Sequence, residues 1–314
     1  MTGATPAART GPVVVLAGGT GGAKLARGML DVVGADELVV IANTGDDIEI
    51  YGAYVSPDPD LITFWLADAI DERGWGLAGD TFQTMDGLTA LGVEVWFNLG
   101  DRDLAIGIER ARLLASGSRL TDAQAQVAAA MGVGARVLPM SDRPVRTRVL
   151  ADGRWWGLQE FLIKRRGAGP VDDVDFRGAG AARPSPEVLA AIDQARAILI
   201  GPSNPVISIG PILAIGQLRA ALQQSPAPVV AVSPLVGGAV VKGPTEPFLA
   251  WAGQPLTSSG IATLYAGLLD GLAADERTDL VPVLETDVLM DSDAARARLA
   301  AETLEFALAL GSSK

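Results

Sequence analysis

Short apolar runs rich in β-branched residues alternate along most of this chain with longer segments in which apolar residues recur at helical spacing. The runs predict strands at residues 13–17, 38–42, 93–97, 197–201 and 229–232. The longer segments predict helices at residues 23–33, 60–71, 81–91, 104–115, 122–131, 186–195, 211–223, 259–269 and 293–309. Because strands that alternate with helices build parallel sheets, we expect a three-layer α/β fold with helices on both faces of one sheet.

The pattern changes between residues 139 and 183. A hairpin is predicted there with its turn at Asp152 and Gly153, since an Asp-Gly pair readily takes the backbone angles of a two-residue turn. A loop-rich connector follows the hairpin. We expect residues 139–183 to form a small antiparallel cap insertion, residues 13–138 and 184–314 to form the nucleotide-binding core, and residues 1–12 to be a disordered tail.

Composition narrows the class of protein. The chain has 314 residues, of which 49% are hydrophobic, and this is enough for a large core. A net charge of −12 argues against a broad surface for nucleic acid or anionic membrane. No apolar stretch approaches the length of a transmembrane helix, and the apolar run after the first twelve residues is too short for a signal peptide. We therefore expect a cytoplasmic protein with no nucleic-acid or membrane partner.

Cysteine and histidine are both absent. Their absence removes disulfides, thiolate nucleophiles, the usual general base and the commonest metal ligand. The chemistry then rests on carboxylates, lysine, arginine, hydroxyls, backbone amides and oxygen-bound metal, which favours magnesium over zinc.

A glycine-rich turn follows the first predicted strand. Gly18, Gly19, Gly21 and Gly22 allow the backbone to approach a ligand closely, and Lys24 adds a positive charge. The N-terminus of the following helix would point free N–H groups at the same place, which suits phosphate. The spacing matches neither the dinucleotide fingerprint nor the P-loop, so a tight turn without a ligand remains an alternative.

Acidic residues gather after the second predicted strand. Asn43, Asp46 and Asp47 follow that strand, and Asp58 and Asp60 come within the next fifteen positions. Carboxylates that converge repel each other unless a cation lies among them, so the cluster predicts a divalent metal. The alternative is that Asp60 caps the helix that follows and the other carboxylates are solvated.

Two further segments carry polar residues at predicted element ends. In residues 79–84 and 98–103, Thr81 offers a hydroxyl donor, and Arg102 could clamp a phosphate or stack on a flat ring. Asp101 and Asp103 are alternatively helix caps that hold Arg102 in an ion pair. In the second half, the turn 201–205 presents two polar side chains suited to a base, ribose or phosphate, Ser203 and Asn204.

The order of these segments resembles a known family. GGTGGAKL, NTGDDIEIYG, SPDPDLITFWLAD, GDTFQT, NLGDRDLA, PMSDRPVRT, LQEFLI, GPSNPVISIGPIL and SPLVGG occur in that order, from about residue 13 to 310. The chain is similar to the 2-phospho-L-lactate transferase family, whose actinobacterial members are also called phosphoenolpyruvate transferases. The resemblance implies a Rossmann-like core, a homodimer and a requirement for Mg²⁺.

The resemblance also implies a reaction in coenzyme F420 biosynthesis. A guanosine diphosphate-linked three-carbon acid donates its phospho-acid group to the ribityl hydroxyl of the deazaflavin Fo, and GMP leaves. Asp60 is the expected base, with Asp47 also catalytic, and the metal would lie among Asp46, Asp58 and Asp60. The donor would meet Gly18, Gly19, Thr20, Gly21, Gly22, Lys24, Asn43, Ser203, Asn204 and Ser233. The acceptor would meet Asp80, Thr81, Phe82, Asn98, Asp101, Arg102 and Asp103.

The hairpin carries two adjacent tryptophans, Trp155 and Trp156, which we expect to stack on the planar acceptor; the alternative is packing in the cap's own small core or at a dimer interface. Two other functions compete with the transferase. A non-enzymatic nucleotide-sugar-binding regulator of the same superfamily would share the glycine loop, but it has less need of clustered carboxylates. A nicotinamide dehydrogenase fits poorly, because the glycine spacing is wrong.

Overall fold

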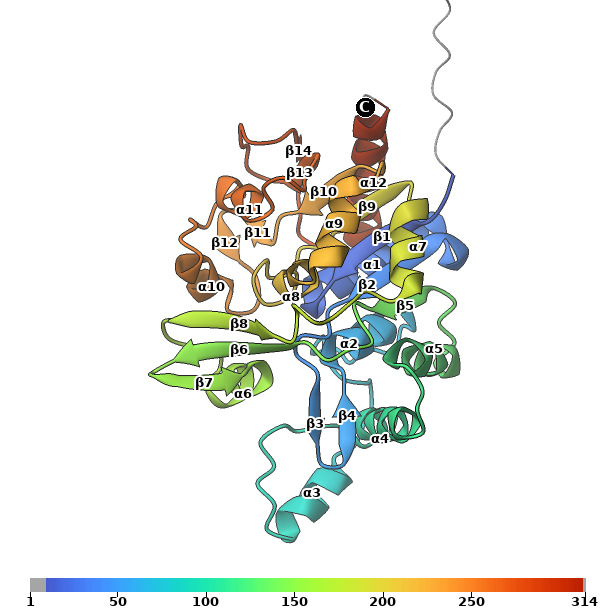
Figure 1. Ribbon diagram of the computed structural model, residues 1–314, viewed down its shortest axis with the longest axis vertical. Coiled ribbons are helices and arrows are strands. Elements are labelled where there is room, and N and C mark those ends of the chain that lie inside the picture. Colours follow the sequence, from blue (N-terminus) through green and yellow to red (C-terminus); the bar gives the residue numbers. More distant parts are fainter. Residues whose placement is uncertain (1–9, 313–314) are drawn as a thin grey trace, which may run out of the picture.

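The computed structural model describes residues 10–312 and is built around a seven-stranded sheet (Figure 1). All neighbouring strands of this sheet are parallel, and their order is β14-β13-β10-β9-β1-β2-β5. The strands are β1 (Val13–Ala17), β2 (Leu38–Ala42), β5 (Arg136–Pro139), β9 (Ala197–Ile200), β10 (Val229–Val232), β13 (Gly271–Ala274) and β14 (Val283–Glu285).

The hydrophobic core is divided between the two faces of this sheet. Because neighbouring residues of a strand point to opposite faces, Val14 and Leu16 belong to one cluster, and Val13 and Val15 belong to the other. The first cluster includes residues of α7 (Pro186–Gln194), α8 (Gly210–Ala214), α9 (Gly216–Gln224), α10 (Thr245–Trp251) and α11 (Ser258–Leu264). The second includes residues of α1 (Gly19–Val33), α2 (Pro57–Leu66) and α12 (Asp293–Gly311). The predicted three-layer α/β fold is confirmed.

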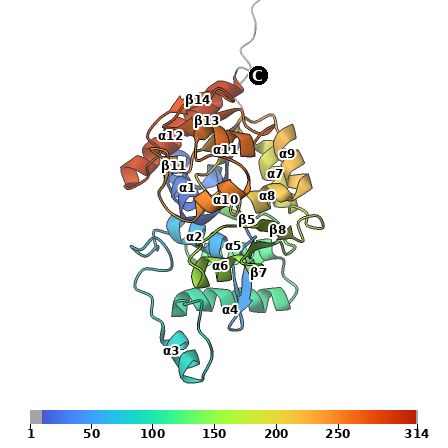
Figure 2. The same ribbon diagram turned by 90° about the vertical axis from the view of Figure 1, so that its left-hand side faces the viewer.

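One predicted strand is not formed, and one predicted helix is divided in two. Residues 93–97 form no strand; they lie in an arm that carries α3 (Gln83–Ala90) away from the sheet (Figures 1 and 2). Val95 and Phe97 pack in a separate small apolar cluster. This cluster also contains residues of α4 (Asp101–Ala115) and of the hairpin formed by β3 (Ile48–Ile50) and β4 (Ala53–Val55). The predicted helix 211–223 is two helices, because Ile215 between α8 and α9 is extended.

The predicted hairpin is confirmed. It pairs β6 (Arg146–Ala151) with β7 (Arg154–Gly157), and Asp152 and Gly153 both have positive φ, of 53° and 71°. A third antiparallel strand, β8 (Asp173–Arg177), and the helix α6 (Leu158–Lys164) complete this unit, which has its own apolar cluster. Its exact limits remain a prediction. The remaining elements are α5 (Leu120–Ala130), the 3-10 helix Ala35–Glu37, β11 (Leu235–Val236) and β12 (Ala239–Val240).

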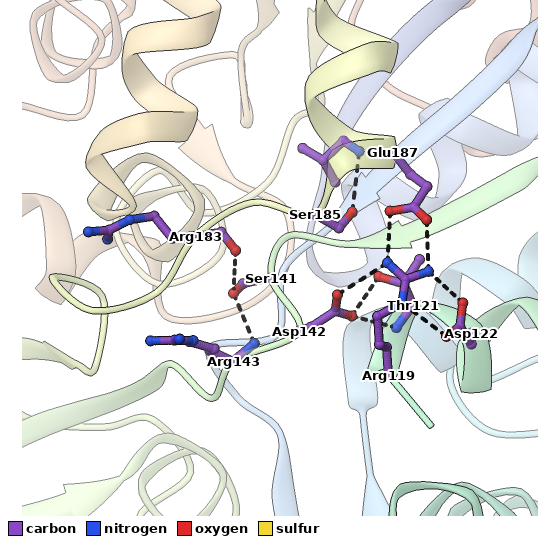
Figure 3. A network of polar contacts seen from close by, with 10 residues as sticks. Arg119, Thr121, Asp122, Ser141, Asp142, Arg143, Arg183, Ser185 and Glu187 are labelled. Carbon is purple, nitrogen blue, oxygen red and sulfur yellow. Dashed lines mark hydrogen bonds and ion pairs between the residues drawn. The ribbon is translucent and has the colours of Figure 1, made fainter. Parts of the chain in front are cut away.

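A polar network joins the two ends of this unit to the core (Figure 3). The Ser141 hydroxyl donates to the carbonyl of Arg183, 42 residues further along the chain, at 2.8 Å. Beside it, the Arg119 guanidinium at the start of α5 donates to Asp122 and, across the chain, to Glu187 of α7. The chain therefore leaves the core and returns to it at one place.

None of the helices between residues 10 and 312 combines the length and apolar character needed to cross a bilayer.

We predict opposite effects for two glycine-to-alanine changes inside helices. A Cβ at Gly28 of α1 would lie 2.3 Å from the Arg296 carbonyl oxygen, where α12 packs against α1, so Gly28→Ala should destabilise the fold by about 1–3 kcal/mol. A Cβ at Gly87 of α3 would meet nothing within 4 Å, so Gly87→Ala should stabilise by about 0.5–1 kcal/mol. Urea unfolding of both variants checks this, and a neutral Gly28→Ala would contradict the close packing of these helices.

Candidate active site

The candidate site lies at the carboxyl ends of β1 and β9, where the strand order reverses direction and parallel sheets bind ligands. A cavity of about 820 Å³ opens there. Of the predicted site residues, its lining includes Gly18, Gly19, Thr20, Gly21, Lys24, Asn43, Asp46, Asp58, Asp60, Asp80, Phe82, Asn98, Asp103, Ser203, Asn204 and Ser233. Five predicted residues are outside this lining: Gly22, Asp47, Thr81, Asp101 and Arg102.

The glycine turn packs tightly against the turn that follows β9. A Cβ at Gly21 would lie 2.1 Å from the Pro202 carbonyl oxygen, and one at Gly22 would lie 2.6 Å from the Ser203 hydroxyl oxygen. Contact between the two turns is therefore enough to require glycine at both positions, and their approach to a ligand stays a prediction. The helix α1 also begins at Gly19, four residues before its predicted start.

A carboxylate already occupies the start of α1. Asp58 accepts a hydrogen bond of 2.6 Å from the Gly19 N–H and one of 2.8 Å from the Asn43 amide. Burial raises the pKa of Asp58 to about 6, although these two donors oppose the rise. The Asp58 side chain thus connects the end of β2 to the helix N-terminus that the sequence assigned to phosphate.

Asp46 is a buried carboxyl with a free oxygen. Its Oδ2 accepts a hydrogen bond of 2.9 Å from the Gln159 amide, whereas its Oδ1 has no partner among the described residues. Burial first, and then the charges of Asp58 and Asp47, hold its pKa well above the usual range. A cation beside Asp46 and Asp58 would relieve this cost, so the residues present fit a divalent metal.

The predicted metal site is smaller than expected. Between residues 10 and 312, no group of three or more carboxylates is arranged to hold a metal ion. Asp46, Asp58 and Asp60 together are therefore not a ligand set, because Asp60 is turned to another partner. Magnesium commonly takes one or two protein carboxylates and completes its shell with water and substrate phosphates, so Asp46 and Asp58 suffice.

Asp60 is held in a buried ion pair. Both of its carboxylate oxygens accept hydrogen bonds from the Arg110 guanidinium of α4, one of them at 3.0 Å. Arg110 is fully buried and also donates to the Tyr54 carbonyl and to Gln124. Asp60 is therefore not a helix cap, since Ser56 occupies that position of α2, and each of its oxygens already accepts a hydrogen bond from Arg110. Its role as a base stays a prediction that this pairing disfavours.

Asp47 is engaged outside the cavity. The Tyr54 hydroxyl donates to its Oδ2 at 2.9 Å, and the Ser56 hydroxyl donates to its Oδ1 at 2.7 Å. Burial raises its pKa to about 7, against the opposing charge of Arg146 and these hydroxyls. The geometry gives Asp47 a supporting place behind Asp46, rather than contact with a ligand.

On the predicted acceptor side, two aspartates cap helices: Asp80 caps α4, and Asp101 caps α3. Asp80 accepts hydrogen bonds from the backbone N–H groups of Arg102 and Asp103 at the start of α4. Asp101 accepts from the Thr81 hydroxyl and from two N–H groups at the start of α3. These donors hold the pKa of Asp101 far below its usual range. The capping alternative thus describes Asp101, which caps α3 rather than its own helix.

Asp103 differs from the other carboxylates of α4. It is half-buried and lines the cavity, and no described residue donates a hydrogen bond to its carboxylate. Burial first, then the charges of Asp60 and Asp80, raise its pKa to about 7. A carboxyl that faces a cavity with free oxygens and titrates near neutrality is suited to exchanging protons with a ligand.

The predicted donor side is formed by both halves of the sheet. Asn204 accepts hydrogen bonds from the N–H groups of Val206 and Ile207, and this leaves its amide nitrogen buried without a partner in the described chain. Ser203 accepts from the Gly18 N–H, and Ser233 from the Leu235 N–H. Lys24 donates to the carbonyl of Met290, and burial lowers its pKa.

Four aromatic side chains also line the cavity, and we call them the aromatic wall: Trp75, Phe82, Trp96 and Phe97. Trp96 and Phe97 stack with ring centroids 5.7 Å apart. The hairpin tryptophans do not line the cavity. Trp155 is 40% exposed outside the cavity, and Trp156 packs in the apolar cluster of its own unit, so their predicted stacking on a ligand is wrong.

Sequence reasoning missed Arg110 and Gln159. Arg110 had a weak signal, since it lies seven residues after Asp103 and so on the same side of α4. Gln159 had none, because its partner Asp46 is 113 residues away.

Removing one partner of the buried ion pair should destabilise the fold. Asp60→Asn leaves the Arg110 charge buried and uncompensated, at a cost of about 3–5 kcal/mol. Arg110→Met should lower the free energy of unfolding much less in the Asp60→Asn protein than in the wild type. Urea unfolding of the two single variants and the double variant measures the coupling. An Asp60→Asn protein as stable as the wild type would show that the pair is not formed.

The raised pKa of Asp103 sets a pH dependence of stability. The pKa of Asp103 is about 7 in the folded protein and about 3.8 in the unfolded chain. Between about pH 3.8 and 7, the folded protein therefore keeps a proton on Asp103 that the unfolded chain has lost. Its contribution to stability is therefore fully present below about pH 4 and is lost as pH rises through about 7. Asp103→Asn should be more stable than the wild type at about pH 8 and equally stable at about pH 4. Equal stability at both pH values would contradict the shift.

Known proteins are similar in sequence to this chain over most of its length. Residues 13–296 match the family 2-phospho-L-lactate transferase CofD. The 2-phospho-L-lactate transferase of Methanosarcina mazei is 40% identical over 84% of this chain and 87% of its own. The phosphoenolpyruvate transferase of Streptomyces griseus is 40% identical over 93% of this chain and 98% of its own.

Solved structures share the fold. A UPF0052 family protein of Bacillus halodurans superposes with a TM-score of 0.56 at 18% identity, covering 93% of this chain and 86% of its own. That likeness concerns the arrangement of strands and helices alone. From the family match and the full-length relatives together, we conclude that this chain belongs to the 2-phospho-L-lactate transferase family.

Proposed function

We propose that the protein transfers a phospho-three-carbon-acid group from its guanosine diphosphate-linked donor to the ribityl hydroxyl of the deazaflavin Fo. GMP leaves, and the product is F420-0 or dehydro-F420-0. The observation that carries the proposal is one cavity whose lining combines a helix N-terminus, the aromatic wall and several carboxylates. The family and the names of the relatives support the same reaction class. The predicted homodimer and cytoplasmic location belong to this proposal.

The lining of the cavity suits both substrates. Because Asp58 takes the Gly19 N–H, the nucleotide diphosphate would meet Thr20 and Gly21 of α1 and the unpaired Asn204 amide. Trp96 and Phe97 offer flat surfaces to a ring system. Carboxylates line the same cavity, where the acceptor hydroxyl would meet the phosphate.

Transfer forms one P–O bond and breaks another. The acceptor hydroxyl oxygen attacks the phosphorus that bears the three-carbon acid, the bond to the GMP oxygen breaks, and GMP leaves with the electron pair. Asp103 accepts the proton of the hydroxyl, because it lines the cavity with free oxygens and has a pKa of about 7. This assigns to Asp103 the role that the sequence gave to Asp60.

Asp46 and Asp58 are the residues that would hold Mg²⁺. When bound, the ion would neutralise charge on the diphosphate, a large part of the cost of phosphoryl chemistry. The unpartnered Asp46 Oδ1 and the raised pKa of both carboxyls fit this role. Asn43 holds Asp58 in place for it.

The test mixes the protein, Fo and Mg²⁺ with each guanylated donor, those of lactate, enolpyruvate and glycerate, and follows the product by mass spectrometry. We expect turnover with one or more donors, loss of turnover with EDTA and recovery with added Mg²⁺. Binding of donor without turnover for any of them would favour the non-enzymatic nucleotide-sugar regulator instead.

Asp103→Asn should lower kcat by about a hundredfold or more, the usual effect of losing a general base. The matched control is Asp86→Asn, which changes an exposed aspartate of α3 outside the cavity and should leave kcat unchanged. An Asp103→Asn protein with wild-type kcat would return the role of base to another residue.

A further inference from the structure

One hydrogen bond joins the small antiparallel unit to the carboxylate site. Gln159 of α6 donates from Nε2 to Asp46 Oδ2 at 2.9 Å, and both side chains line the cavity. Asp46 is only 8% exposed, and its Oδ1 is buried with no partner among the described residues. One oxygen is thus fixed by the amide, and the other is left for a ligand.

We propose that Gln159 is a positioning residue that orients Asp46 for a divalent cation and couples the cation site to the aromatic wall of the cavity. The proposal rests on the function proposed above, and it adds a residue and a linkage between two sites. A neutral amide suits the role, because it donates a hydrogen bond without adding charge beside Asp46 and Asp58.

The coupling follows from the position of Gln159 on α6. Leu162 and Ile163 lie three and four residues further on, so they share its side of the helix, and both line the cavity. Ile163 is 37% exposed and offers apolar surface for a planar acceptor to cover. A ligand packed on these residues restrains α6, and with it the amide that holds Asp46.

The same helix is anchored on its other side. Phe161 is fully buried and packs edge to face against Phe248 of α10, with ring centroids 5.9 Å apart. Lys164 at the end of α6 lies 4.9 Å from the centre of the Trp96 ring. The helix therefore contacts the aromatic wall at one end and Asp46 at the other, and occupancy of the wall acts on Asp46 through a rigid element.

The test measures binding of Mn²⁺, as a substitute for Mg²⁺, to the full chain by electron paramagnetic resonance of the free ion, with and without Fo. Gln159→Met keeps the length of the side chain and removes its donor. We expect it to weaken Mn²⁺ binding by about 10- to 100-fold, the usual effect of losing such an outer partner. Fo should tighten Mn²⁺ binding in the wild type and lose this effect in Gln159→Met. By linkage, Mn²⁺ should tighten Fo binding by the same factor.

The matched control is Glu160→Gln, on the same helix but outside the cavity lining, where the side chain pairs with Lys164 at 3.7 Å. It should keep wild-type Mn²⁺ affinity and the wild-type response to Fo. In an Asp46→Asn background, Gln159→Met should have no further effect on the residual Mn²⁺ affinity. This cycle separates positioning of Asp46 from general damage to α6, which would lower affinity in both backgrounds.

Unchanged Mn²⁺ affinity in Gln159→Met overturns the positioning role, and an equal effect of Fo in wild type and variant overturns the coupling. If the wild type binds no Fo, the proposed function and the coupling both fail. The comparison of Mn²⁺ affinities without Fo still decides the role of Gln159 at Asp46.

Discussion

The site depends on direct backbone contact between two turns, one after β1 and one after β9. A Cβ at Gly201 would lie 2.8 Å from the Gly22 Cα, and a Cβ at Gly22 would lie 2.8 Å from the Ala17 Cβ. Only glycine permits this approach. The contact brings the start of α1 and the side chain of Ser203 to one point, where Ser203 accepts a hydrogen bond from the Gly18 N–H. The glycine-lined part of the cavity follows from this packing.

Hydrogen bonding divides the carboxylates of the site into two kinds. Asp47, Asp58 and Asp60 accept a hydrogen bond from the protein on each oxygen. Asp46 keeps one oxygen without a partner among the described residues, and burial raises the pKa of both Asp46 and Asp103. A bound cation or a proton would relieve the cost of burying such carboxylates, and raised pKa values of this kind cluster at functional sites.

The sequence predicted the central strands well because buried parallel strands are continuous apolar runs. β13 was not predicted, because Gly271–Ala274 are mostly small residues and make no strong apolar run. Residues 93–97 were wrongly predicted as a strand, because their apolar side chains pack in the small cluster beside the arm of α3. Most predicted site positions do line the cavity. Which carboxylate stays free could not be read from sequence, because Arg110 is 50 residues from its partner Asp60.

The network in Figure 3 has a consequence for how this fold can be varied. Because Ser141 bonds to Arg183, the ends of the small antiparallel unit are fixed side by side, and the entropy of closing that loop changes little with its length. The turn at Asp152 and Gly153 can therefore vary in length without moving β5 or α7. The helix α6 cannot, because Gln159 holds Asp46 and Phe161 packs against Phe248.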